Sequence, residues 1–138
     1  MTDSAALTAF WNHVRAENPA LPEQTPGAWA FGATPDHADS LLALVLAGVK
    51  TGTASSQWDY DETGDPEPYV GELSIILDGS GAPRAVLETT AVRTVPFDEV
   101  TDEHAHAEGE GDRTLTYWRE SHERYWRAHS ENLSLIHI

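Results

Sequence analysis

The sequence predicts an α+β fold, in which helices flank a curved sheet or a small β-barrel. Two segments, 4–17 and 36–47, carry apolar residues at helical spacing. Several short β segments follow, without the regular alternation of strand and helix that builds a parallel α/β sheet. The 138 residues are enough for one domain with a real core, and we expect that domain to span 1–130.

The first helix is predicted over 4–17, because its apolar side chains share one face and Pro19 follows its end. Residues 18–31 contain Pro19, Pro22, Pro26 and Gly27, and they are expected to form an irregular connection.

The second helix begins at Asp36, which can act as its N-cap, and ends at Gly48. The hydroxyl-rich segment 51–56 is then expected to form a strand. Residues 59–68, rich in acids, glycine and proline, are typical of a loop.

Two longer strands are predicted over 70–77 and 84–95, joined by the turn sequence Asp78-Gly79-Ser80-Gly81. A short helix is expected to begin at Asp98, and the glycines at 109 and 111 should end it. A last helix opens at Arg113 or Thr114, and its aromatic residues and His122 lie on one face, as core packing requires.

The composition excludes several classes of protein. The net charge is -15, from 23 acids and 8 bases, which argues against tight binding of long nucleic-acid duplexes. The chain has no cysteine, so it has neither disulfides nor thiolate metal sites. It has no leader-like N-terminus and no apolar run of about 18 residues, so we expect a cytoplasmic protein without a membrane partner.

Lys50 is the only lysine of the chain, and it follows a helix end and precedes a run of Thr and Ser. It could complement the helix dipole, or it could serve a site together with the Thr53 hydroxyl. In a regular strand these two side chains would face opposite ways, so a shared site requires a bend at Gly52.

The segment 104–112 contains two histidines and a series of acids. If it is helical, His104 pairs with Glu108 and His106 with Glu110, a spacing that suits two ligands of one metal. The sequence supplies no third ligand, and short acid-rich segments near helix ends are usually solvated faces, so this interpretation is favoured and we assign no metal ligand. Glu110 lies between two glycines and could be a general acid or base on a loop.

Arginines in the second half of the chain, together with aromatic residues, could form a surface for single-stranded RNA or a nucleotide. Trp58, Tyr60 and Arg113 are the members that we assign to substrate binding. Pairing of the helical arginines with Glu120 and Glu123 is the structural alternative.

The segment Gly48-Val49-Lys50-Thr51-Gly52-Thr53 resembles the G-x-K-x-x-T signature of ASCH domains, which are PUA-like. The resemblance covers roughly residues 28–129 and includes the motifs E-G-E-G-D, at 108–112, and Y-W-R-x-x-H, at 117–122. In these features the chain is similar to the larger bacterial ASCH proteins.

The resemblance implies a PUA-like β-barrel whose mouth takes RNA or a nucleoside. Some members cleave RNA with a divalent metal, and a smaller branch removes acyl groups from the exocyclic nitrogen of cytidine. By resemblance to that branch, Thr53 would be the nucleophile, Lys50 its activator and Glu110 the proton carrier, with Glu108 as the neighbour that could replace Glu110 or contact substrate. Cleavage of single-stranded RNA is the function expected first; RNA binding without catalysis and N4-acylcytidine deacylation are the alternatives. The one cofactor implied is a divalent cation, Mg²⁺ or Mn²⁺.

Two features depart from the family pattern. Ser55 stands where the signature often has an Arg. Residues 131–138 do not resemble the strand that usually ends these domains, so we interpret them as an atypical tail, and the sheet or barrel could lack its last strand.

Overall fold

The computed structural model describes residues 4–32, 34–56, 64, 67–129 and 135–137. The chain divides into two compact units, Met1–Ala43 with Leu73–Glu88, and Leu44–Glu72 with Thr89–Ile138. The α+β class is confirmed, and in the described residues the strands form two three-stranded sheets rather than a closed barrel. No helix among the described residues is long and apolar enough to cross a membrane. The single domain over 1–130 stays a prediction.

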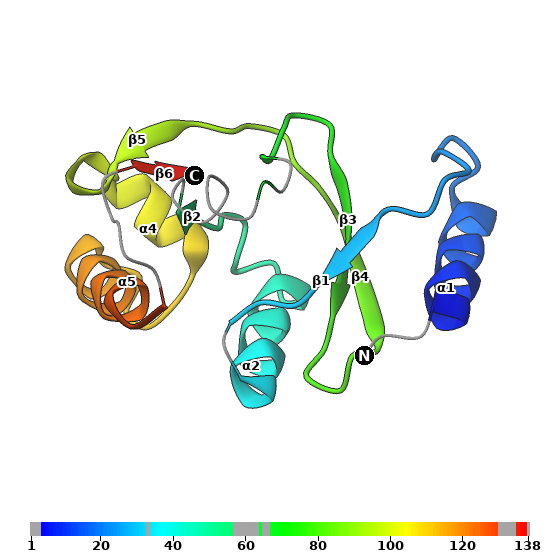
Figure 1. The fold of residues 1–138 in the computed structure, drawn as a ribbon, viewed down its shortest axis with the longest axis horizontal. Coiled ribbons are helices and arrows are strands. Elements are labelled where there is room, and N and C mark those ends of the chain that lie inside the picture. The colour runs from blue at the N-terminus through cyan, green and yellow to red at the C-terminus, as the bar shows by residue number, and fades with distance from the viewer. Residues whose placement is uncertain (1–3, 33, 57–63, 65–66, 130–134, 138) are drawn as a thin grey trace. The chain divides into compact units, whose positions relative to one another are not determined.

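The first unit contains a sheet of order β1-β3-β4, visible in Figure 1. Strand β1 (Gly27–Trp29) runs parallel to β3 (Leu73–Leu77), and β4 (Pro83–Glu88) runs antiparallel to β3. The prediction of an irregular segment over 18–31 therefore missed β1. The prolines of this segment indicate a loop, and a strand of three residues that pairs with a distant strand leaves no local pattern in the sequence.

Helix α1 (Ser4–Glu17) has the bounds that the apolar spacing predicts. Its Trp11 is fully buried, packs in the core with Ile75 and Leu77, and donates a hydrogen bond from Nε1 to the Pro22 carbonyl at 3.0 Å. Helix α2 (Pro35–Leu46) also agrees with the sequence, and its described buried residues are Ala38, Leu41 and Leu42.

The turn between β3 and β4 is confirmed. The Asp78 carboxylate accepts hydrogen bonds from the Ser80 hydroxyl, from the Ala82 backbone and from the Ser80 backbone. These bonds, with that of the Ser80 side chain the largest, lower the pKa of Asp78 to about 2.

The second unit contains a sheet of order β2-β6-β5, whose neighbours are antiparallel. Its strands are β2 (Ser55–Ser56), β6 (Leu135–His137) and β5 (Thr94–Pro96). The tail therefore does supply a strand, at the centre of this sheet, against the expectation that the last strand could be missing. The single strand predicted over 84–95 is also wrong, because β4 and β5 belong to different sheets.

Two helices complete the second unit, α4 (Asp102–Glu108) and α5 (Leu115–His129). The predicted start at Asp98 is instead a one-turn 3₁₀ helix, Phe97–Glu99, which ends because Val100 is extended. Helix α4 begins three residues later, where the Thr101 hydroxyl accepts a hydrogen bond from the His104 amide. The core lies between these elements and contains Val100, Ala105, Trp118 and Trp126, as the aromatic face of the last helix predicts.

Candidate functional site

The loop after α2 carries Lys50 against the C-terminal end of α4. Gly48 ends α2 with a φ of 77°, a left-handed conformation that suits glycine. The amides of Thr51 and Gly52 then donate to the Ala107 carbonyl at 2.7 and 3.0 Å. These bonds replace a strand ladder, which is why the strand predicted over 51–56 is reduced to Ser55–Ser56.

Gly109 ends α4 and lets the chain turn between two glutamates. Its φ is 74°, and a Cβ at this position would lie 2.9 Å from Val49 Cγ1 and 3.0 Å from the Val49 carbonyl oxygen. Only glycine fits this close approach of two backbones without strain. The turn allows Glu108, the last helical residue, and Glu110, in the following loop, to reach the same amine.

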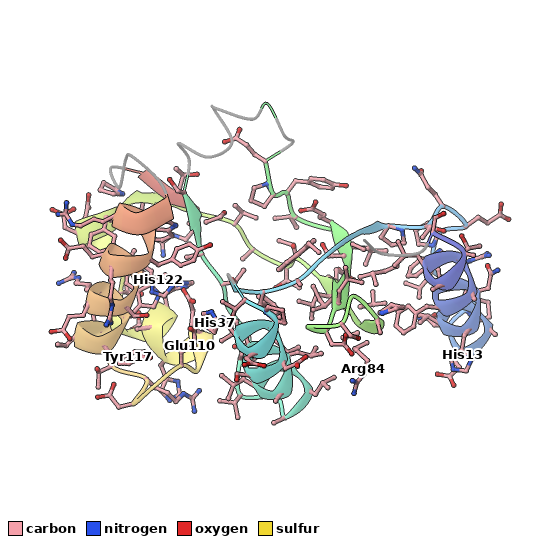
Figure 2. The ribbon with its side chains drawn as sticks, turned by 60° about the horizontal axis from the view of Figure 1, so that its bottom comes forward. His13, His37, Arg84, Glu110, Tyr117 and His122 are labelled. Carbon is pink, nitrogen blue, oxygen red and sulfur yellow. The ribbon has the colours of Figure 1, made fainter. Side chains whose placement is uncertain are left out.

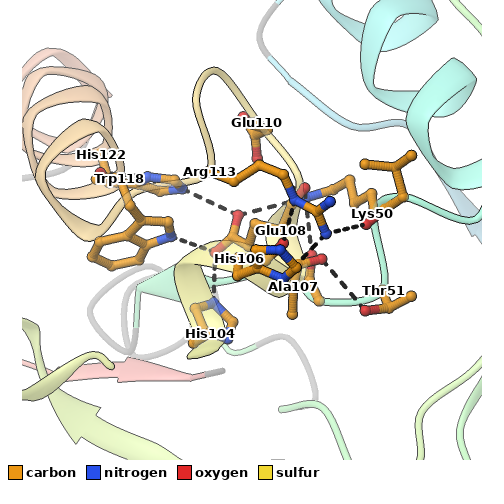
Figure 3. A network of polar contacts seen from close by, with 12 residues as sticks. Lys50, Thr51, His104, His106, Ala107, Glu108, Glu110, Arg113, Trp118 and His122 are labelled. Carbon is orange, nitrogen blue, oxygen red and sulfur yellow. Dashed lines mark hydrogen bonds and ion pairs between the residues drawn. The ribbon is translucent and has the colours of Figure 1, made fainter. Parts of the chain in front are cut away.

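That amine is Nζ of Lys50, a buried residue. Figure 3 shows the polar contacts around it. It donates to the Gly52 carbonyl at 2.9 Å and to Glu110 Oε2 at 3.1 Å. The Glu108 carbonyl oxygen and Oε1 lie farther away, at 3.4 and 3.5 Å. The lysine is therefore held by two carboxylates and by the peptide that joins Gly52 to Thr53.

Glu108 is the centre of the polar network, and its side chain is 2% exposed. Its Oε2 accepts hydrogen bonds from His104 Nε2 and from Trp118 Nε1, both at 2.6 Å, while its Oε1 faces Lys50 and His122. Burial alone raises the pKa of this carboxyl. The hydrogen bonds from the two histidines and the charges of His122 and Lys50 outweigh burial and hold the pKa well below its ordinary value.

His122 completes the cluster from α5. Its Nδ1–H donates to the Trp118 carbonyl at 2.8 Å, and its ring stacks on the Trp118 indole with centroids 4.2 Å apart. Its Nε2 is thereby directed at Glu108 Oε1, 3.4 Å away. Burial lowers the pKa of His122, but the hydrogen bond and the negative charge of Glu108, and more weakly Glu110, raise it above its ordinary value. Figure 2 shows His122 and Glu110 in the same part of this unit.

The structure brings together Lys50, Glu108 and Glu110 of the site residues that the sequence suggested. Thr53 lies outside any strand and is exposed, so strand alternation no longer separates it from Lys50. Its hydroxyl forms no hydrogen bond with another of the described residues. Its part in the site stays a prediction, supported by the lysine's contact with the preceding peptide.

Arg113 lies beside this site, where it joins two backbone segments. It is the one described non-glycine residue with a positive φ, 64°. Its Nε donates to the His106 carbonyl at 3.0 Å, and its Nη2 lies 3.2 Å from His106 Nδ1 and 3.5 Å from the Val49 carbonyl. Its substrate-binding role stays a prediction. Trp58 and Tyr60 lie outside the described residues.

The metal arrangement considered from the sequence is not formed. His104 bonds directly to Glu108, and α4 ends before Glu110, so the second helical pair does not exist. Among the described residues, the ligand atoms that gather within 4.8 Å of one another belong to Glu108, Glu110 and His122. His122 was missed as a site residue because its helical position also suits the core; its place in the Y-W-R-x-x-H motif was the available signal.

Comparisons with known proteins give consistent results. A family model described as ASCH domain matches residues 27–136. The crystal structure of a protein from Enterococcus faecalis has a TM-score of 0.86 and 30% identity, covering 98% of this chain and 85% of that one. The ASCH domain from Lactobacillus crispatus has a TM-score of 0.84 and 23% identity, covering 99% and 91%. A comparison with curated proteins found no match.

Proposed function

Because the chain belongs to the ASCH domain family, which is associated with RNA in general terms, we propose that it is a hydrolase for an RNA-derived substrate. The sequence favoured cleavage of single-stranded RNA. The charges of the site favour a neutral nucleoside substrate, and we assign the reaction to removal of the acyl group from an N4-acylated cytidine.

The contact between Lys50 and Glu110 is the observation that carries this proposal. A cation and a carboxylate meet at 3.1 Å, with side chains 2% and 16% exposed. Such a pair, one member of which reaches solvent, can hold a developing negative charge and move a proton in the same place.

The charge balance favours the neutral substrate. Glu108 and Glu110 both contact the one amine, so the lysine's charge is already compensated, and a phosphodiester would meet a nearby carboxylate. The chain as a whole carries a net charge of -15, which further opposes a polyanion. An acylated cytidine brings no charge and pays no such penalty.

The chemistry can be written with these groups. The Thr53 hydroxyl attacks the acyl carbon and passes its proton to the Glu110 carboxylate, while the Lys50 ammonium stabilises the oxyanion. The bond from the acyl carbon to N4 then breaks, and N4 takes the proton from Glu110. Water hydrolyses the Thr53 ester, giving one proton to Glu110, which returns it to the Thr53 oxygen. Free carboxylic acid and cytidine are released.

The test is a deacylation assay with N4-acetylcytidine, followed by the absorbance change and by chromatography of cytidine. Thr53→Ala, Lys50→Ala and Glu110→Gln should each lower kcat/KM by about 10²-fold or more. Thr51→Ala is the matched control, since Thr51 is also an exposed hydroxyl next to the lysine, and it should retain activity. Full activity of Thr53→Ala would exclude this mechanism.

A second arm distinguishes the alternatives. The same proteins are incubated with a single-stranded RNA oligonucleotide, with and without Mn²⁺. Cleavage that is lost in Lys50→Ala, without deacylation, would restore RNA cleavage as the function. Binding without either reaction would identify a binding module.

A further inference from the structure

The geometry points to Lys50 as an internal replacement for a divalent cation. In this inference, which rests on the proposed site, the ammonium fills a position enclosed by Glu108, Glu110 and His122. It keeps metals out while it is there, and removing the amine opens a metal site. Hydrolysis at this site would consequently need no divalent ion.

The three enclosing residues have the donor atoms of a metal site. Two carboxylate oxygens and one imidazole nitrogen lie within 4.8 Å of one another, contributed by Glu108, Glu110 and His122. Two carboxylates and an imidazole suit Zn²⁺, Mn²⁺ and related ions. Glu108 and Glu110 come from the end of α4 and the loop that follows it, and His122 comes from α5, so two segments of the chain supply the three side chains (Figure 3).

The lysine amine already contacts the two carboxylates of this set. Nζ lies 3.1 Å from Glu110 Oε2 and 3.5 Å from Glu108 Oε1, and the Gly52 carbonyl fixes it from a third side at 2.9 Å. The lysine side chain is 2% exposed. A metal ion that approached the same oxygens would meet this positive charge with little water to screen it.

The spacing of the donors is compatible with an ammonium and with a metal. A tetrahedral ion with bonds of about 2.1 Å holds its ligand atoms about 3.4 Å apart. An ammonium with acceptors at about 3.0 Å holds them about 4.9 Å apart. His122 Nε2 and Glu108 Oε1 are 3.4 Å apart, as around a metal, while the three ligand atoms all lie within 4.8 Å of one another, a spread that also accommodates an ammonium. Without the amine, a small rotation of Glu110, which is the most exposed of the three, would contract the cluster.

The experiment measures metal binding directly, by calorimetric titration with Zn²⁺ and with Mn²⁺. All proteins carry His13→Gln, because the exposed His13 and Glu17 form an i,i+4 pair that could bind Zn²⁺ on its own. The protein with Lys50 is compared with Lys50→Ala, with Glu110→Gln and with Lys50→Ala/Glu110→Gln. Circular dichroism and tryptophan fluorescence verify folding, and Lys50→Met, which retains the apolar stem, is titrated if Lys50→Ala does not fold.

We expect Lys50→Ala to bind one equivalent of metal at least 100-fold more tightly than the lysine protein, and the added Glu110→Gln to abolish this gain. One equivalent bound by the lysine protein, and lost on Glu110→Gln, would overturn the inference, because metal and amine would then share the site. A folded Lys50→Ala that binds no metal would overturn it too. Both results are independent of turnover, so an inactive protein would refute the proposed function and leave this test intact.

Discussion

Replacing Glu108 with glutamine tests whether this carboxylate holds the second unit together. Glutamine has the same size, but it has one acceptor oxygen and one NH₂ donor in place of two acceptor oxygens. In the protein, Oε2 accepts from His104 and Trp118, and Oε1 faces Lys50 and His122. Whichever way the amide is turned, its NH₂ meets two donors.

The expected loss follows from the burial of the network. The Glu108 side chain is 2% exposed, and so is that of Lys50. Removing one partner of a buried ion pair typically costs about 3–5 kcal/mol, because the remaining charge is left without compensation. Since a domain of this kind has a total stability of about 5–15 kcal/mol, Glu108→Gln should lose a large part of it.

Urea unfolding followed by tryptophan fluorescence measures this loss. With an m-value of about 2 kcal/mol/M, the midpoint should fall by about 2 M. Glu123→Gln is the matched control, because Glu123 pairs with Arg127 at 2.7 Å on the exposed side of α5. Exposed pairs of this spacing contribute about 0.3–0.5 kcal/mol. Equal midpoints for the two variants would refute the central role of Glu108.

Two further predictions concern pH and backbone. The pKa of Glu108 is lowered from 4.5, so the stability that Glu108 contributes is complete above pH 4.5 and is lost as the pH falls through the lowered pKa. The pKa of His122 is raised from 6.5, so the stability that His122 contributes is complete below pH 6.5 and is lost as the pH rises through the raised pKa. Thermal midpoints from pH 3 to 9 should therefore be highest between about 4.5 and 6.5, and His122→Gln should flatten the alkaline decline; an unchanged decline would assign it to other groups. In urea unfolding, Gly109→Ala should lower the free energy of unfolding at least twice as much as Gly48→Ala does. Both glycines have a positive φ, but of the two only Gly109 lacks room for a Cβ. Equal losses of free energy would show that the contact with Val49 is not tight.

The parts of the fold that the sequence predicted correctly are those with local causes. Helix α1 follows from apolar spacing, the end of α2 from Gly48, and the turn after β3 from a short sequence with one aspartate and two glycines. The short strands β1 and β6 have no such signal, because each exists only through its partners. The break between β4 and β5 likewise reflects two different sheets.

The sequence predicted some of the residues of the candidate site, but not how they are arranged. Lys50 stood out as the single lysine, and Glu110 because of the glycines on both sides. The position of Glu108 depends on a lysine 58 residues away along the chain and on a helix that follows a separate turn. Periodicity predicted His122 as a core residue, and in the structure its ring stacks on Trp118 while its Nε2 lies 3.4 Å from Glu108 Oε1.

The two glutamates around the lysine differ in whether their carboxylate is accessible to a substrate. Both oxygens of Glu108 face donors from the protein, and its pKa is held low, so it can neither give nor take a proton without breaking the network. Glu110 contacts Lys50 through Oε2, and its side chain is 16% exposed, so a ligand can reach it. Glu110→Gln should therefore lower kcat with a small change in stability, whereas Glu108→Gln should lower stability first. If the two substitutions had the opposite effects, Glu108 would be the proton carrier, and the neutral substrate would have to be bound from the buried side of the lysine.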